Sequence, residues 1–261
     1  MRGYRRALIT GASSGIGRAF ARQLPATTDL LLTGRDAARL DEEAQRLTKP
    51  GRHIETLACD LTRDEGRERL VGQAEAFDVD LLVNNAGAGR LGRFLDSPEE
   101  TERQTVLLNV VAVVDLTRRL LPGMLARAKA GQRRAGLIVV ASTAAFAPVP
   151  MFATYAASKA FDLQFTEALA EELRDEPIDV VALCPGATRT EFGPRAGWQG
   201  RGMPGAADPR DVAADALAAL GRQTVCVPGR LSEAALSPVV MPRRLLTGAL
   251  GLAMRFVAGG R

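Results

Sequence analysis

The stretch RRALITGASSGIGRAF, residues 5–20, decides the fold of this chain. A β-prone apolar run leads directly into a turn rich in glycine and serine, and a helical segment follows. Glycines 11, 15 and 17 have the spacing G-x-x-x-G-x-G, not the G-x-G-x-x-G of the commoner dinucleotide fingerprint. Such a turn lets a pyrophosphate approach the N-terminus of the helix. A tight structural turn is the alternative interpretation.

Similar strand-like runs recur along the chain, and most are continuously apolar, as is typical of parallel strands buried on both faces. The predicted strands are RRALIT (5–10), DLLLTG (29–34), IETLAC (54–59), DLLVNN (80–85), GLIVVAS (136–142), IDVVALC (178–184) and QTVCVP (223–228). The helical segments between them are long enough for right-handed crossovers. We therefore expect an α/β fold, a Rossmann-type doubly wound sheet of seven parallel strands with helices on both faces.

The composition excludes several classes of protein. With 261 residues, 46% of them hydrophobic and 25% charged, the chain can bury a core without metals or disulfides. Its three scattered cysteines indicate a reducing compartment and form no metal cluster. The net charge of +4 comes from arginines interleaved with acids, which argues against nucleic-acid binding. No signal peptide or apolar run of membrane-spanning length is present, so we expect a cytoplasmic protein.

Two regions depart from the alternation of strands and helices. Residues 186–207 form a long loop rich in glycine and proline, which in a compact domain indicates function or disorder. Phe192, Trp198 and Met203 in this loop suggest an apolar substrate lid, and its arginines could meet an anionic group or be solvated.

The second region is the C-terminal part. Residues 1–230 are predicted to form the dinucleotide-binding catalytic domain, and 231–261 an amphipathic helical extension of it. We favour packing of this extension on its own or a neighbouring subunit. The alternatives are capping of the substrate pocket and contact with a membrane surface.

The predicted second and third strands end in residues that suggest a choice of cofactor. Enzymes selective for NAD usually place an acid at the end of the second strand, where this chain has Gly34 followed by Arg35. An arginine suits a ribose 2′-phosphate, so we favour NADP over NAD. Asp60, after the third strand, could accept from the adenine amino group or cap the next helix.

Five motifs occur in order at the expected strand ends. They are TGASSGIG (10–17), NNAG (84–87), Ser142, YAASK (155–159) and PGATRT (185–190). With them the chain resembles the short-chain dehydrogenase/reductase family over about residues 5–230. The segment after Pro185-Gly186 and the continuation beyond the seventh strand are mild departures from the family pattern.

The resemblance implies roles for individual positions. It places the cofactor against Gly11, Ser13, Ser14, Gly15, Ile16, Gly17, Arg35, Asp60, Leu61, Asn85, Ala86, Gly87, Tyr155, Lys159, Pro185, Gly186, Thr188 and Thr190. It makes Asn109, Ser142, Tyr155 and Lys159 the catalytic group, with Asn109 binding a water that relays protons from Lys159. It also implies a homodimer or homotetramer formed through the helices that carry Asn109 and Tyr155.

The residue types support this chemistry. Reduction of a carbonyl leaves charge on oxygen that must be protonated, and Tyr155 is a suitable acid if its pKa of ~10 is lowered. Lys159, one of three lysines among 34 basic residues, lies one helical turn later. Its compact ammonium would favour the phenolate and bind the nicotinamide ribose better than arginine would. Ser142 could donate to the developing oxyanion.

The sequence therefore predicts an oxidoreductase that transfers a hydride between NADP(H) and the carbonyl or secondary alcohol of a small apolar substrate, with Tyr155 as acid and base. The alternatives are a dinucleotide-binding regulator or scaffold without turnover and an epimerase or dehydratase of the same fold. The single histidine, His53, is expected at the surface, and no metal is expected. The sequence does not specify the substrate.

Overall fold

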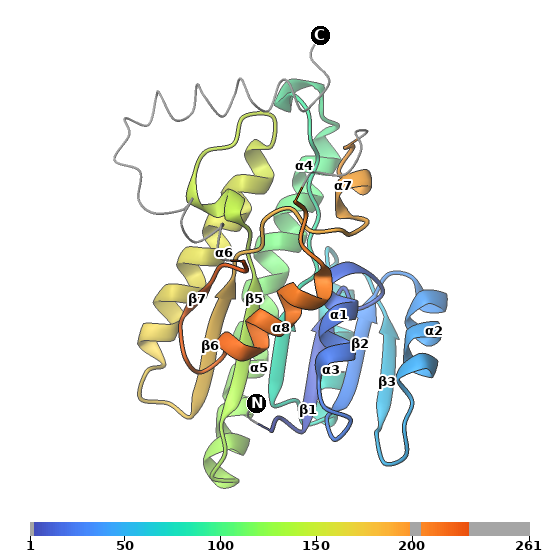
Figure 1. Ribbon diagram of the computed structural model, residues 1–261, viewed down its shortest axis with the longest axis vertical. Coiled ribbons are helices and arrows are strands. Elements are labelled where there is room, and N and C mark those ends of the chain that lie inside the picture. The colour runs from blue at the N-terminus through green and yellow to red at the C-terminus, as the bar shows by residue number, and fades with distance from the viewer. Residues whose placement is uncertain (1–2, 199–204, 230–261) are drawn as a thin grey trace.

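The computed structural model describes residues 3–198 and 205–229 (Figure 1). In this part of the chain seven strands form one parallel sheet, in the order β3-β2-β1-β4-β5-β6-β7. The strands are β1 (Arg6–Thr10), β2 (Asp29–Gly34), β3 (Ile54–Ala58), β4 (Leu81–Asn84), β5 (Ala135–Val140), β6 (Ile178–Leu183) and β7 (Val225–Cys226). The predicted fold class is confirmed. The predicted extension 231–261 and the lid residue Met203 lie outside the described residues.

Helices connect the strands and cover both faces of the sheet. The longer ones are α1 (Gly15–Gln23), α2 (Ala37–Leu47), α3 (Asp64–Ala76), α4 (Glu99–Val106), α5 (Ala112–Ala130), α6 (Ala153–Glu172) and α8 (Pro209–Ala219). A π-helical turn, η2 (Leu107–Val111), joins α4 to α5, and α7 (Phe192–Arg195) is a single turn. Apolar contacts place α1, α2 and α8 on one face and α3, α5 and α6 on the other.

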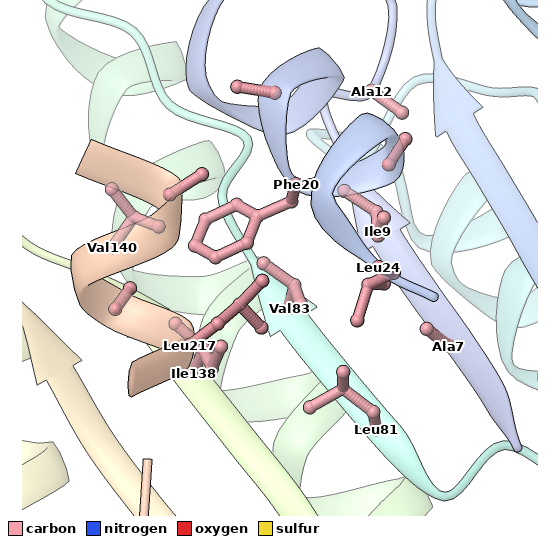
Figure 2. Close-up of a cluster of buried hydrophobic side chains, with 14 of the residues drawn as sticks. Ala7, Ile9, Ala12, Phe20, Leu24, Leu81, Val83, Ile138, Val140 and Leu217 are labelled. Atoms are coloured by element: carbon pink, nitrogen blue, oxygen red, sulfur yellow. The ribbon is translucent and has the colours of Figure 1, made fainter. Parts of the chain in front are cut away.

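Alternate residues of each strand supply the two cores. Ile9, Val83 and Ile138 face α1 and α8, whereas Leu8 and Leu82 face α3 and α5. This period of two on continuously apolar strands is what burial on both faces requires. Figure 2 shows the ring of Phe20, from α1, lying over the sheet beside Leu217 of α8.

The strand order reverses at β1, whose two neighbours are β2 and β4. The loops that leave the carboxyl ends of β1 and β4 therefore run in opposite directions, and a crevice opens between them. A doubly wound sheet binds its ligands at this point.

The segment predicted as a long loop is closed at its base. Ala207 donates its N–H to the Ala187 carbonyl at 2.8 Å, and Arg189 donates to the Ala207 carbonyl at 2.9 Å. The described part of the segment, which lies between β6 and α8, contains the helical turn α7.

Replacing Phe20 by alanine tests the core. Phe20 is fully buried, and Phe→Ala changes in cores cost about 3–5 kcal/mol in the free energy of unfolding. Chemical denaturation measures this loss. Phe94→Ala is the matched control because its ring is 60% exposed, and it should change stability by less than about 0.5 kcal/mol. Similar losses in the two variants would contradict the packing described.

Candidate active site

The glycine-rich turn owes its shape to backbone geometry and close packing. Gly11 and Gly15 have positive φ angles of 67° and 55°, which side chains disfavour. A Cβ on Gly17 would lie 2.4 Å from the Gly11 carbonyl oxygen, so only glycine lets α1 approach the turn. Ser14, at the N-cap of α1, makes no side-chain capping bond, so the N–H groups of the first turn are available to an anion.

Hydrogen bonds join this turn to the NNAG segment. The Thr10 hydroxyl accepts from the N–H groups of Asn85 and Ala86, both at 2.9 Å. The Asn85 amide in turn donates to the Thr10 carbonyl at 2.8 Å. The Asn85 side chain therefore holds the two loops together, and Ala86 and Gly87 line the space between them.

The adenosine end of the cavity has a cation and few carboxylates. Arg35 is exposed at the end of β2, and a Cβ on Gly34 would lie 3.3 Å from the Ser13 hydroxyl. Asp36 is occupied at the N-cap of α2, where it accepts from the Arg39 N–H at 3.1 Å.

Asp60 does not cap α3, whose N-cap is Arg63. Its Oδ1 instead accepts from the Thr62 N–H at 3.0 Å and the Thr62 hydroxyl at 2.8 Å. Burial would raise the pKa of Asp60, but these bonds, with Arg35 nearby, hold that pKa below its usual value. Asp60 is thus an ionised acceptor at the wall of the cavity.

The predicted catalytic residues come together at the carboxyl ends of β4 and β5. Ser142 follows β5 and accepts from the Ala144 N–H at 3.1 Å, which leaves its own hydroxyl proton free to point elsewhere. Tyr155 and Lys159 lie one turn apart on α6. Lys159 Nζ donates to the Val140 carbonyl at 2.7 Å and to Asp162 Oδ2 at 2.9 Å.

Asn109 lies in η2 and is fully buried. Its Oδ1 accepts from the Ala88 N–H at 2.9 Å, and its amide donates to the Ala88 carbonyl at 2.8 Å and to Ser158 Oγ at 2.9 Å. The side chain therefore connects the NNAG segment to α6. A π-helical turn is a frequent feature of functional sites.

Burial dominates the acid–base behaviour of Tyr155. Burial raises the pKa of Tyr155 above its ordinary value, although Lys159 and a hydrogen bond with Ser142 both lower it. Lys159 thus lowers the pKa of Tyr155 as expected, but burial raises that pKa by more. Burial would lower the pKa of Lys159, but Asp162 and Tyr155 raise it above its ordinary value, so the ammonium stays charged. The phenol is protonated at neutral pH.

One cavity of about 1910 Å³ contains both halves of the site. Of the predicted residues that the structure describes, all line it except Gly17 and Asn109, which are buried behind its wall. Arg39 of α2 pairs with Glu191 at 2.7 Å, and Thr190 lies against Gly15, so the segment after β6 reaches the nucleotide half.

The substrate end of the cavity is aromatic. Phe152 stacks on Tyr155 with ring centroids 4.3 Å apart, and Phe192 packs at 5.2 Å from the same ring. A Cβ on Gly89 would lie 2.7 Å from Tyr155 Cδ2, so glycine there lets the main chain touch the ring. Trp198 also lines the cavity.

The sequence analysis missed Phe152, Gly89 and Asp162. Phe152 is three residues before Tyr155 and Asp162 three after Lys159, so helical spacing was the available signal for both. Gly89 carried no such signal, because its contact with Tyr155 joins two distant segments.

Three further observations concern the described ranges, 3–198 and 205–229. His53 lies at the surface, its side chain 63% exposed, beside Glu55. No group of residues there could hold a metal ion. No helix in that part of the chain is long and apolar enough to cross a membrane.

A glycine-rich turn at the switch point, in one cavity with a Ser-Tyr-Lys cluster, defines an oxidoreductase of the nicotinamide-dinucleotide class. A profile of the short chain dehydrogenase family matches residues 5–197. The chain belongs to this family, which confirms the resemblance seen in the motifs.

Relatives support this placement. The very-long-chain 3-oxoacyl-CoA reductase of Pyrenophora tritici-repentis is 36% identical over 186 residues, which are 68% of this chain and 52% of the relative. Human dehydrogenase/reductase SDR family member 4 is 33% identical over 192 residues, 71% of this chain and 66% of the relative. The chain spans about half the length of the fungal reductase, at 52%.

Solved structures show which cofactors fit this fold. A short-chain dehydrogenase from Sphingobium yanoikuyae in complex with NADPH has a TM-score of 0.76 and 30% identity, covering 98% of this chain and 96% of that one. The 3-ketoacyl-(acyl-carrier-protein) reductase of Brucella melitensis, complexed with NADH, has a TM-score of 0.73 and 30% identity, covering 87% and 98%. The cofactor class is therefore a nicotinamide dinucleotide, which the cradle around Gly17 fits.

Replacing Gly17 by alanine tests this cradle. The added Cβ would meet the Gly11 carbonyl oxygen at 2.4 Å and force the turn open. We expect cofactor affinity to fall at least ~10-fold, a loss of about 1.4 kcal/mol, in a fluorescence titration with NADPH. The control is Gly72→Ala at an exposed position of α3, where an added Cβ meets nothing within 4 Å. Equal affinities in the two variants would contradict the assignment.

Proposed function

We propose that this protein is an NADP(H)-dependent oxidoreductase that interconverts a carbonyl and a secondary alcohol on a small apolar substrate. The observation that carries the proposal is the shared cavity. The glycine-rich turn, Ser142, Tyr155 and Lys159 all line it, and Phe152 and Phe192 stand beside the tyrosine.

Each residue has a role in reduction. When bound, the reduced nicotinamide supplies a hydride to the carbonyl carbon. Ser142 would donate a hydrogen bond to the carbonyl oxygen and orient it, without giving up its proton. Tyr155 gives its phenolic proton to the same oxygen, so the products are the alcohol and a phenolate. Lys159 stabilises that phenolate until solvent returns a proton, and the reverse steps oxidise an alcohol.

Asn109 acts through position. Because its amide is bonded to Ala88 and Ser158, it fixes the NNAG segment against the helix that carries Tyr155 and Lys159. We keep the predicted proton relay through a water at Asn109 as part of the proposal.

Preference for NADP rests on charge. Arg35 is exposed at the end of β2, and the acid that follows it in the sequence, Asp36, is occupied at the N-cap of α2. A 2′-phosphate would meet this guanidinium without a competing carboxylate at position 34. The solved relatives include one with NADPH and one with NADH, so the preference rests on Arg35 alone.

The aromatic substrate end favours an apolar ketone. The cavity that contains Phe152 and Phe192 is also lined by Leu91, Phe146 and Val149. The Pyrenophora relative is named as a reductase of very-long-chain 3-oxoacyl-CoA. An apolar chain beside the reacting carbonyl fits both observations.

Assembly and location complete the proposal. Phe161, which stacks on Phe165, and Val106 are exposed on α6 and α4, and we propose that these helices form a homodimer or homotetramer. The three cysteines are buried, and their odd number and scattered positions fit a reducing, cytoplasmic compartment.

Replacing Tyr155 by phenylalanine tests the activity. Without the proton donor, turnover in a screen of ketones and alcohols, followed by nicotinamide absorbance, should fall roughly 10²–10⁴-fold. NADPH affinity should be kept. Tyr4→Phe, at the only other tyrosine, is the control and should keep turnover. A cellular function that survives Tyr155→Phe intact would support a scaffold without turnover, and an absence of net NADPH consumption with any carbonyl would support an epimerase or dehydratase.

Replacing Arg35 by alanine tests the choice of cofactor. Loss of a charged hydrogen bond to the 2′-phosphate costs about 1.5–3 kcal/mol, so NADPH should bind roughly 10- to 100-fold more weakly. NADH affinity should not change. The control, Arg46→Ala, removes an arginine from the last turn of α2, the helix that follows Arg35. An unchanged ratio of the two affinities would contradict the NADP assignment.

A further inference from the structure

Asp162 is a buried carboxylate for which the proposed mechanism has no role. It lies one turn after Lys159 on α6, its side chain is fully buried, and its Oδ2 accepts from Lys159 Nζ at 2.9 Å. Among the described residues, its Oδ1 has no hydrogen-bond partner. An acceptor left partly unsatisfied in a buried position calls for an explanation.

Stability does not supply that explanation. Taking a carboxylate and an ammonium out of water costs more than one good contact returns, and apolar residues of similar size usually do as well. Asp162 also leaves one of its two oxygens without a partner. The pair therefore has an effect other than holding α6 in place.

The geometry shows where that effect acts. Two of the three N–H groups of Lys159 are directed to Asp162 and to the carbonyl of Val140, the last residue of β5. Ser142 follows Val140 by two residues, so Asp162 helps to fix the ammonium at the strand end that carries the catalytic serine. Nζ also lies beside Gly87, where a Cβ would be 3.5 Å away, so the nitrogen is close to the predicted cofactor-binding segment.

The charges of the pair indicate in which direction Asp162 shifts the protonation of Tyr155. Burial raises the pKa of Asp162, but the Lys159 ammonium 2.9 Å away opposes this rise, so we take the pair as an ammonium and a carboxylate with no net charge. Tyr155 therefore meets a local ammonium–carboxylate dipole in place of a full positive charge. In agreement, burial is the largest cause that raises the pKa of Tyr155, and Asp162 adds to the rise while Lys159 opposes it.

We propose that Asp162 is a positioning residue that holds the Lys159 ammonium at the end of β5 and offsets its charge, so that Tyr155 keeps its proton at neutral pH. This inference rests on the proposed function. Under it, the protonated phenol required for carbonyl reduction persists to high pH. The phenolate required for alcohol oxidation forms only at still higher pH.

The other groups around the pair do not produce this effect. Asn109 and Ser142, from η2 and the end of β5, carry no titratable charge. Burial, with Cys226 nearby, raises the pKa of Cys184 to about 12, so this thiol at the end of β6 stays neutral. Glu167, further along α6, acts on Cys184 but is not among the groups that shift Tyr155.

A spectroscopic titration of the phenolate tests the proposal without requiring turnover. The chain has two tyrosines, so subtracting the curve of the matching Tyr155→Phe protein isolates Tyr155. We expect Asp162→Asn and Asp162→Ala each to lower its titration midpoint by about one pH unit or more. Asp162→Glu, which keeps the charge, should restore most of the shift. Circular dichroism at each pH identifies the variants that stay folded.

Glu171→Gln is the matched control. It removes the same charge from the same helix at a side chain that is 68% exposed, and it should leave the midpoint unchanged. With an active substrate, the alkaline fall of reduction and the alkaline rise of oxidation should both move to lower pH by the same interval in the Asp162 variants. A purely structural residue would lower both rates without moving either limb.

An unchanged or raised midpoint in folded Asp162→Asn and Asp162→Ala would overturn the proposal, since it would mean that Asp162 only keeps Lys159 protonated. A lowered midpoint in a protein that turns over no carbonyl would support the role of Asp162 and count against the proposed function alone.

Discussion

The hydrogen bonds between Thr10 and the Asn85–Ala86 turn are the contact on which the site depends. They join the ends of β1 and β4 where the strand order reverses, so the glycine-rich turn and the NNAG segment form one wall. Asn109 extends this wall to α6 through Ala88 and Ser158. The nucleotide half and the catalytic half are thus connected by hydrogen bonds of the uncharged side chains of Thr10, Asn85 and Asn109.

The fold was predictable because its signals are local. Seven apolar runs and the glycine spacing after Thr10 are visible in the sequence, and crossover handedness leaves few ways to arrange them. The neighbours of Tyr155 were predictable only in part. The spacing from Tyr155 to Lys159 lies within one helix and is local. By contrast, Phe192 and Gly89 come from other segments and contact the Tyr155 ring only after folding.

Electrostatics marks the limit of the sequence analysis. The lysine was expected to lower the pKa of the tyrosine, and its effect has that sign, but burial reverses the net direction. Burial depends on how η2, α6 and the aromatic residues close around the ring. The ammonium also has a partner, Asp162, that no family motif contains. Residue types indicated the reaction, and the packing around them determines its pH range.

The excursion between β6 and α8 begins and ends at one pair of main-chain hydrogen bonds, between Ala187, Arg189 and Ala207. The residues between Arg189 and Ala207 can change in number and composition while the sheet and the Ser-Tyr-Lys cluster keep their places. Exchange of the segment between related enzymes at these junctions should therefore transfer substrate range as a module. Because Phe192 belongs to the segment and packs on Tyr155, such an exchange would also alter the surroundings of the phenol.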